Sequence, residues 1–289
     1  MPDYGYEIQL GIDTVDPVTE QFDCIDESLA LAEEIIDGNG MKGTRSRALE
    51  RTAEGIRRVG GGLVLEPTAN EWALLLPWIL GGTPSGTNYP LAEALSSRYV
   101  NIDRGSRRFT YSGCLVNRAT FRSSEGEVLT VDLDIIGVDE SVSATAFPTI
   151  TLNTDKRFYF HNLSLTVGGT GYNAKDFELV VDNAVDSDRF HNSQTLSTDA
   201  NARDRIITVS TMLPYSDAVA VYASGEAGVA IVATFTNGTV SLALSLGKVV
   251  FPRESPTQRG RDEILLPVRG QAYESGGTAE LVTTLDNTP

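Results

Sequence analysis

Short runs in which apolar and polar residues alternate recur along most of the chain. A period of two residues, together with β-branched side chains, is typical of half-buried β-strands. Clusters of Gly, Asn and Ser separate the runs, and Asn237-Gly238 predicts a tight hairpin. The sequence therefore predicts a mainly β protein, with strands at Gly62–Glu66, Phe109–Phe121, Val128–Ile136, Arg157–Val167, Phe177–Val181, Arg205–Thr211, Val229–Phe235, Val240–Phe251 and Ile264–Ala272.

Two segments have the spacing of helices instead. Thr68 and Glu71 form the pattern of a capping box. The apolar residues that follow at helical spacing predict a helix over residues 69–80, with Pro77 inside it and Gly81 at its end. A second, shorter helix is expected from Ser216, as its cap, to Gly225, with an apolar stripe of Val219, Tyr222 and Ala223.

The two halves of the chain show the same order of features. In each half a strand precedes a long polar loop (Gly38–Arg51 and Ala184–Arg203), and then come a strand, a proline, a helix and a glycine. Such an order predicts an internal duplication, with domains at residues 1–150 and 151–289 and a junction in Thr145–Asp155. Chance similarity between β-rich segments is the alternative.

Charge is abundant and unevenly distributed. The chain has 289 residues and a net charge of −16, which argues against a surface that grips nucleic acid. Residues 1–41 contain eleven acids and no Lys or Arg, whereas basic residues follow at once. An acidic segment beside a basic loop allows head-to-tail stacking of copies, although pairing within one chain explains it equally well. The basic residues are Lys42, Arg45, Arg47, Arg51, Arg57 and Arg58.

Side chains that could carry chemistry are few. Cys24 and Cys114 are too few for a disulfide framework or a cysteine-rich zinc site, and His161 and His191 lack zinc-ligand spacing. Asp132 and Asp134 alternate along one strand and so point to one face, as a catalytic pair or as part of a polar sheet face or channel. We find no constellation that supports catalysis, and we predict no catalytic, metal-binding or cofactor-binding residues.

Four segments of the first half together resemble tail tube proteins of long-tailed siphophages, of the type with two tube folds in one chain. The second half resembles the second copy through residues 177–183, 188–190 and the strand before Pro214, but its expected helix is shorter and Ala-rich. The resemblance covers most of the chain. The segments of the first half are Gly43-Thr44-Arg45-Ser46, Glu50-Arg51, residues 58–68 (RVGGGLVLEPT) and residues 74–82 (LLLPWILGG).

The resemblance implies two tandem β-sandwich or barrel-like domains, each with one flanking short helix. It implies a structural protein of the virion, made in the cytoplasm of the host bacterium, with no visible signal peptide. Subunits would join their inner sheets edge to edge into trimeric, pseudo-hexameric rings. Stacked rings would form a hollow tail tube, with tape measure, tail terminator and distal tail or baseplate proteins as partners.

The implied roles of individual residues follow from this arrangement. The loop that carries Lys42, Arg45, Arg47 and Arg51 would contact the neighbouring ring. Asp132 and Asp134 would face an acidic lumen, through which DNA passes without specific binding because phosphates are repelled.

Three other readings stay open on the sequence. The first is the inner tube of a contractile injection or secretion machine. The second is a β-sandwich binding or adhesin module, which would need an exposed aromatic platform that Trp72 and Trp78, in the helix stripe, do not suggest. The third is an enzyme with an unrecognised site.

Overall fold

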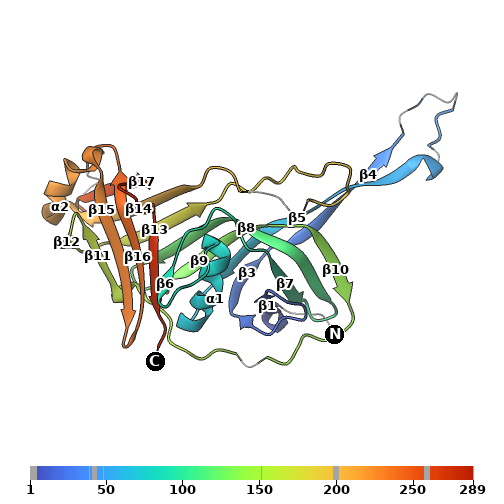
Figure 1. The fold of residues 1–289 in the computed structure, drawn as a ribbon, viewed down its shortest axis with the longest axis horizontal. Coiled ribbons are helices and arrows are strands. Elements are labelled where there is room, and N and C mark those ends of the chain that lie inside the picture. Colours follow the sequence, from blue (N-terminus) through green and yellow to red (C-terminus); the bar gives the residue numbers. More distant parts are fainter. Residues whose placement is uncertain are drawn as a thin grey trace.

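The computed structural model describes residues 5–38, 40, 44–47, 49–150, 152–197, 202–256 and 261–288. Antiparallel strands dominate it, which confirms the prediction of a mainly β protein (Figure 1). Two α-helices are described, α1 (Ala69–Leu80) and α2 (Tyr215–Tyr222). Short 3₁₀ turns lie at Gly5–Glu7, Leu49–Arg51, Phe160–Asn162 and Gly225–Ala227.

One long sheet crosses both halves of the chain, and we call it the joined sheet. Its strands pair antiparallel in the order β3/β4, β5, β9, β8, β13, β14, β17, with β3 and β4 running in succession along the same edge of β5. These strands are β3 (Cys24–Glu27), β4 (Ala30–Asp37), β5 (Thr52–Leu65), β9 (Thr130–Gly137), β8 (Arg108–Ser124), β13 (Asp176–Asp182), β14 (Ile206–Pro214) and β17 (Leu265–Ala272).

Each half adds further strands around one long, shared strand. In the first half, residues 108–114 of β8 lie between β7 (Arg98–Asp103) and β10 (Asp139–Ser143). In the second half, β16 (Val240–Val250) lies in the same way between β15 (Val229–Asn237) and β18 (Val282–Asp286). The remaining strands are β1 (Gln9–Asp13), β2 (Gln21–Phe22), β6 (Asn88–Tyr89), β11 (Leu163–Val167) and β12 (Thr170–Tyr172).

The hairpin of β4 and β5 projects from the body as an arm, which we define as residues 34–56 (Figure 1). Beyond the base of the arm, Arg57 donates to Glu33 across the two strands (3.0 Å). The expected loop between Gly38 and Arg51 lies at its tip, since β4 ends at Asp37 and β5 begins at Thr52. The arm carries part of the sheet away from the rest of the molecule.

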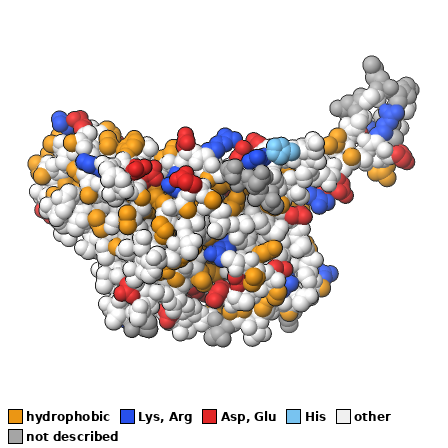
Figure 2. Space-filling view, viewed as in Figure 1, with side chains coloured by type: hydrophobic (Ala, Val, Ile, Leu, Met, Phe, Trp, Pro, Cys, Tyr) orange, Lys and Arg blue, Asp and Glu red, His pale blue; other side chains and the backbone are white. Residues whose placement is uncertain are grey.

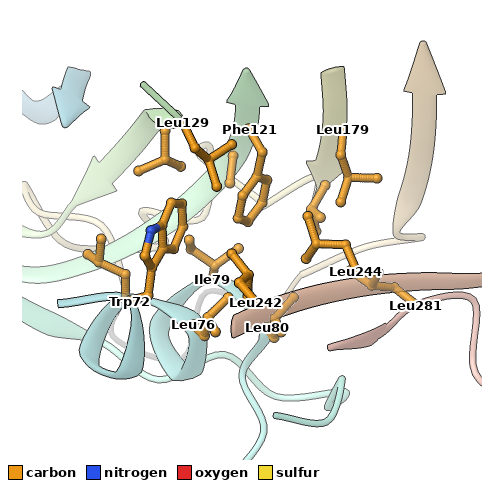
Figure 3. Packing of buried hydrophobic residues seen from close by; sticks show 14 of the residues in the cluster. Trp72, Leu76, Ile79, Leu80, Phe121, Leu129, Leu179, Leu242, Leu244 and Leu281 are labelled. Atoms are coloured by element: carbon orange, nitrogen blue, oxygen red, sulfur yellow. The ribbon is translucent and has the colours of Figure 1, made fainter. Parts of the chain in front are cut away.

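Helix α1 fills the space between the two halves. The capping box is present, with the Thr68 amide donating to Glu71 (2.6 Å), and Gly81 ends the helix at φ 80°. Trp72 stacks on Phe121 of β8, with ring centroids 5.3 Å apart. Figure 3 shows Leu242 and Leu244 of β16 in the same cluster, so strands of both halves share one core.

The second helix differs from its expected form. Its cap is Pro214 rather than Ser216, and it ends at Tyr222. Val219 is 52% exposed, whereas Ala218 and Val221 are buried, so the predicted stripe is wrong. The kink at Ala218, with φ −103° and ψ 17°, shifts the phase of the helix, which a regular helical period cannot anticipate.

Candidate functional site

The joined sheet has one apolar side and one polar side. On β9, Val131, Leu133 and Ile135 are buried against the core, while Asp132 and Asp134 alternate with them toward solvent. Paired neighbours continue the same side across β8, β13 and β17. We call this side the polar face, with the charged residues Arg118, Arg122, Asp132, Asp134, Asp176, Glu178, Asp182 and Arg269.

The polar face carries mixed charge. Arg122 lies opposite Glu178 and donates to it (2.9 Å), and it also lies 3.6 Å from Asp132. Asp134 accepts from the side-chain amide of Asn117 (2.7 Å). The two aspartates predicted from their alternation therefore do share one side, but each has a polar partner there. Their partners were not predictable, because they depend on the register of β8 against β9.

A seven-residue pairing joins the sheets of the two halves. Residues 118–124 of β8 lie antiparallel to residues 176–182 of β13. Asn183, directly after β13, is buried and donates to the carbonyls of Ile79 and Val116 (3.0 Å each). The pairing is therefore anchored to the end of α1. The sequence did not predict these two contacts of Asn183, because they join segments that lie far apart in the chain.

The arm places three of the four predicted basic residues at its tip. Arg45, Arg47 and Arg51 are exposed, while Lys42 lies outside the described residues. Arg47 pairs with Asp37 within the arm, and Arg51 donates to the carbonyl of Gly40. Figure 2 shows charged side chains on the projecting arm together with apolar ones, and the exposed apolar residues there are Ile35, Ile36 and Leu49.

A groove of about 940 Å³ opens along β3, at the end of β5 that lies away from the arm. Arg104 holds this strand through two bonds to Glu27 (2.9 and 2.8 Å) and one to the carbonyl of Leu29 (2.7 Å). The bonds to Glu27 raise the pKa of Arg104. Gly61 permits the close approach of the same segment to β5, since its φ is 152° and a Cβ would lie 2.3 Å from the Ser28 carbonyl oxygen. Within the Gly60-Gly61-Gly62 run, Gly61 thus has a packing reason.

The other candidate side chains are scattered. Cys114 is buried, which raises the pKa of its thiol to about 12, and burial raises the pKa of Cys24 to about 11. His161 stacks on Tyr159, while His191 accepts from Arg189 (3.2 Å). Within the described ranges, no cluster of His, Cys, Asp or Glu has the geometry to hold a metal ion.

The tryptophans bear on the alternative of a binding or adhesin module. Trp72 and Trp78 are both fully buried in α1 and contribute to the core instead of an exposed platform. None of the helices described here has the length and apolar character needed to cross a membrane.

Comparison with known proteins gives one match that covers most of the chain. No curated protein sequence matches it. The sequence model of the family described as phage tail tube protein matches residues 7–281, which include every strand of the joined sheet, the arm and both helices. Members of that family are structural proteins, and membership implies that the protein is a component of the virion. On this match and its mainly β architecture, the chain belongs to the phage tail tube protein family.

Proposed function

We propose that copies of this chain assemble as trimeric rings that stack into the hollow tail tube through which DNA enters the host. The observation that carries the proposal is the joined sheet, which crosses both halves of the chain in a family of tube proteins. Each half supplies one part of that sheet, as residues 1–150 and 151–289. A ring of three chains then has six such parts, which makes it pseudo-hexameric.

The polar face suits the inner wall of such a tube. Acidic side chains outnumber basic ones on it, and Asp132 and Asp134 would face the lumen. Three chains of charge −16 give a ring charge of 3 × (−16) = −48, which disfavours tight binding of phosphates. The polar face carries five carboxylates against three arginines, and the ion pair of Arg122 with Glu178 neutralises one of the three.

The arm suits the contact between rings. It projects from the body and exposes both apolar and basic side chains. Exposed apolar side chains are unfavourable in water, and contact with an acidic, partly apolar surface would bury them and pair the basic charges. Arg45, Arg47 and Arg51, with Lys42 beside them in the sequence, would supply the charge. Tape measure, tail terminator and distal tail or baseplate proteins would contact the inside and the two ends of the tube.

Electron microscopy of the concentrated protein, with and without tail extract as a seed, tests the proposal. We expect hollow tubes with three chains in each ring. Tubes with six chains in each ring would retain the tube and contradict the duplication. Compact particles under every condition, with seeds included, would contradict assembly and favour a binding module.

A further inference from the structure

The arm has almost no buried surface of its own. Among its described residues Gly55 alone is buried, and the others are exposed or half-buried. A two-stranded hairpin without a packed face is only marginally stable in water. The direction in which the arm projects must therefore be set where it joins the body.

A β-bulge lies at this junction. Glu33 of β4 pairs with Arg57 of β5. Further toward the tip, Ile35 pairs with Glu54, so β5 has one residue more than β4 between the two pairs. A bulge bends its strand and disrupts the ladder locally. The arm thus leaves the sheet at a bend, and its angle depends on what holds the two sides of the bulge.

A segment of the second half spans this bulge, and we call its residues 184–197 the support loop. The Gln194 carbonyl accepts from the Arg57 amide (2.7 Å), while the side-chain amide of Gln194 donates to the Glu54 carbonyl (2.9 Å). β9 pairs with β5 only from Val59 onward, so the support loop lies along the edge that β9 leaves free. One residue therefore holds β5 on both sides of the bulge.

Arg58 makes a second contact beside the first. It donates to the Ser187 carbonyl (3.2 Å) and to Asp188 (2.9 Å). Its guanidinium also lies 4.7 Å from the centre of the Phe190 ring, and a cation over an aromatic face is attracted to it. Phe190 is only 7% exposed, so Arg58 connects the base of the arm to a packed part of the support loop.

The support loop is itself fixed to the joined sheet. The Val185 amide donates to the side chain of Asn117 on β8 (2.9 Å). Arg203, where the chain returns toward β14, pairs with Asp186 (3.1 Å). Figure 1 shows the segment running from the end of β13 to the arm. The loop therefore connects β8 to the arm through fixed points at both ends.

The place of the support loop in the chain matches that of the arm tip. It lies between β13 and β14, as the arm tip lies between β4 and β5, and both β5 and β14 lead into a helix. One of the two long loops thus projects from the body, whereas the other folds back onto the base of the first.

We propose that the support loop positions the arm for the contact between rings, with Gln194 as the positioning residue. The loop holds both sides of the bulge and so fixes the angle at which the arm leaves the sheet. An arm already held in its bound direction loses less freedom on contact. A ring of three chains then presents three directed arms to the next ring, and in this the inference rests on the proposed function.

Spin-label distances in the unassembled chain test the positioning. Labels are placed at Ala53→Cys on the arm and at Glu127→Cys between β8 and β9, two exposed sites, in a Cys24→Ser background. Cys114 is fully buried and stays unlabelled. With the support loop intact, we expect double electron–electron resonance to give one narrow distance distribution.

The variant Arg58→Ala/Gln194→Ala removes the side-chain contacts of the support loop with the arm and its base. We expect it to broaden the distance distribution and to raise the protein concentration at which tubes form. Its melting temperature should stay unchanged, because both side chains are exposed. Gln194→Glu is a second variant, which keeps the length of the side chain but turns an acceptor toward the Glu54 carbonyl. It should broaden the distribution as well.

A matched variant controls for charge and for changes in the loop. Arg107→Ala/Asn192→Ala loses the same charge and also removes one side-chain amide from the support loop. Asn192 is exposed and has no side-chain hydrogen bond to another described residue, and Arg107 is an exposed residue outside the arm. This variant should keep the narrow distribution and form tubes at the wild-type concentration.

The outcomes separate this inference from the proposed function. A distribution that stays narrow in both Gln194 variants would overturn the positioning, as would equal broadening in the matched variant. Broad distances together with tubes at the wild-type concentration would also overturn it, since the direction of the arm would then not matter for stacking. Absence of tubes from the unmodified chain, even with seeds, would instead overturn the proposed function.

Discussion

Glu71 places a carboxylate in the first turn of α1 with only 2% of the residue exposed. Its oxygen accepts from the Thr68 amide (2.6 Å), which satisfies a donor that the helix leaves unpaired. Burial raises the pKa of Glu71 above its usual value of 4.5, since the charged form loses hydration. Capping and charge burial therefore oppose each other at this residue.

We predict that Glu71→Gln keeps the cap and removes the buried charge. Its free energy of unfolding at pH 7 should equal or exceed that of the wild type, whereas Glu71→Ala should lose about 1 kcal/mol. Because the folded pKa is raised, the wild type gains stability from this group as pH falls from the folded pKa toward 4.5. Urea unfolding between pH 4.5 and 8 measures both effects. A loss for Gln as large as that for Ala would contradict this account.

At the scale of residues, local chemistry was predictable and distant partners were not. The capping box follows from Thr68 and Glu71 alone, because its two bonds join residues three apart. The shared side of Asp132 and Asp134 follows from strand alternation. The contact of Arg122 with Glu178, by contrast, joins residues 56 apart and depends on how β8 meets β13.

At the scale of elements, α1 offers a matched pair of tryptophans. The Trp78 indole donates to the carbonyl of Cys114 (2.9 Å), whereas the indole N–H of Trp72 is buried without a partner among the described residues. We predict that Trp78→Phe lowers the free energy of unfolding more than Trp72→Phe, by about 1–3 kcal/mol, since it orphans a buried carbonyl. Chemical denaturation followed by circular dichroism checks the difference, and equal losses would contradict it.

The arm shows why some strands escaped prediction. The sequence predicts a strand before the Gly38–Arg51 loop and a strand at Gly62–Glu66 after it, but β5 extends back to Thr52. Residues of the arm are exposed on both sides, so they lack the buried face that produces an alternating pattern. The short strands β1, β7 and β18 were also missed, because few residues in each leave little periodicity to detect.

At the scale of the whole molecule, the arm makes a prediction about assembly. Arg45→Glu/Arg51→Glu changes the net charge from −16 to −20, since each substitution contributes −2. We expect this variant to fold with an unchanged melting temperature and to fail to form tubes, because it reverses the charge of the proposed contact with the next ring. Electron microscopy and thermal unfolding measure the two properties.

A control variant distinguishes an effect of the arm's position from an effect of the net charge alone. Arg107→Glu/Arg261→Glu makes the same change of net charge at two exposed arginines outside the arm. It should form tubes as the wild type does. If both variants assemble equally well, the arm does not carry the contact between rings through its charge.

The sequence predicted the mainly β fold class of the molecule. It did not predict that one sheet and one core would extend across both halves. The repeated order of features indicated two similar halves. It gave no sign that β8 and β13 would pair, or that α1 would pack against strands of both halves. Those contacts join segments far apart in the chain, where periodicity carries no information about which edges meet.

The β8–β13 pairing also bears on how easily a ring begins. Two sheet segments held in one chain meet without a loss of translational and rotational freedom, a loss that costs separate bodies an estimated 4–15 kcal/mol on association. In a ring of three chains, half of the six contacts between segments are then complete when each chain has folded. Linking the halves therefore lowers the concentration at which the proposed ring can form.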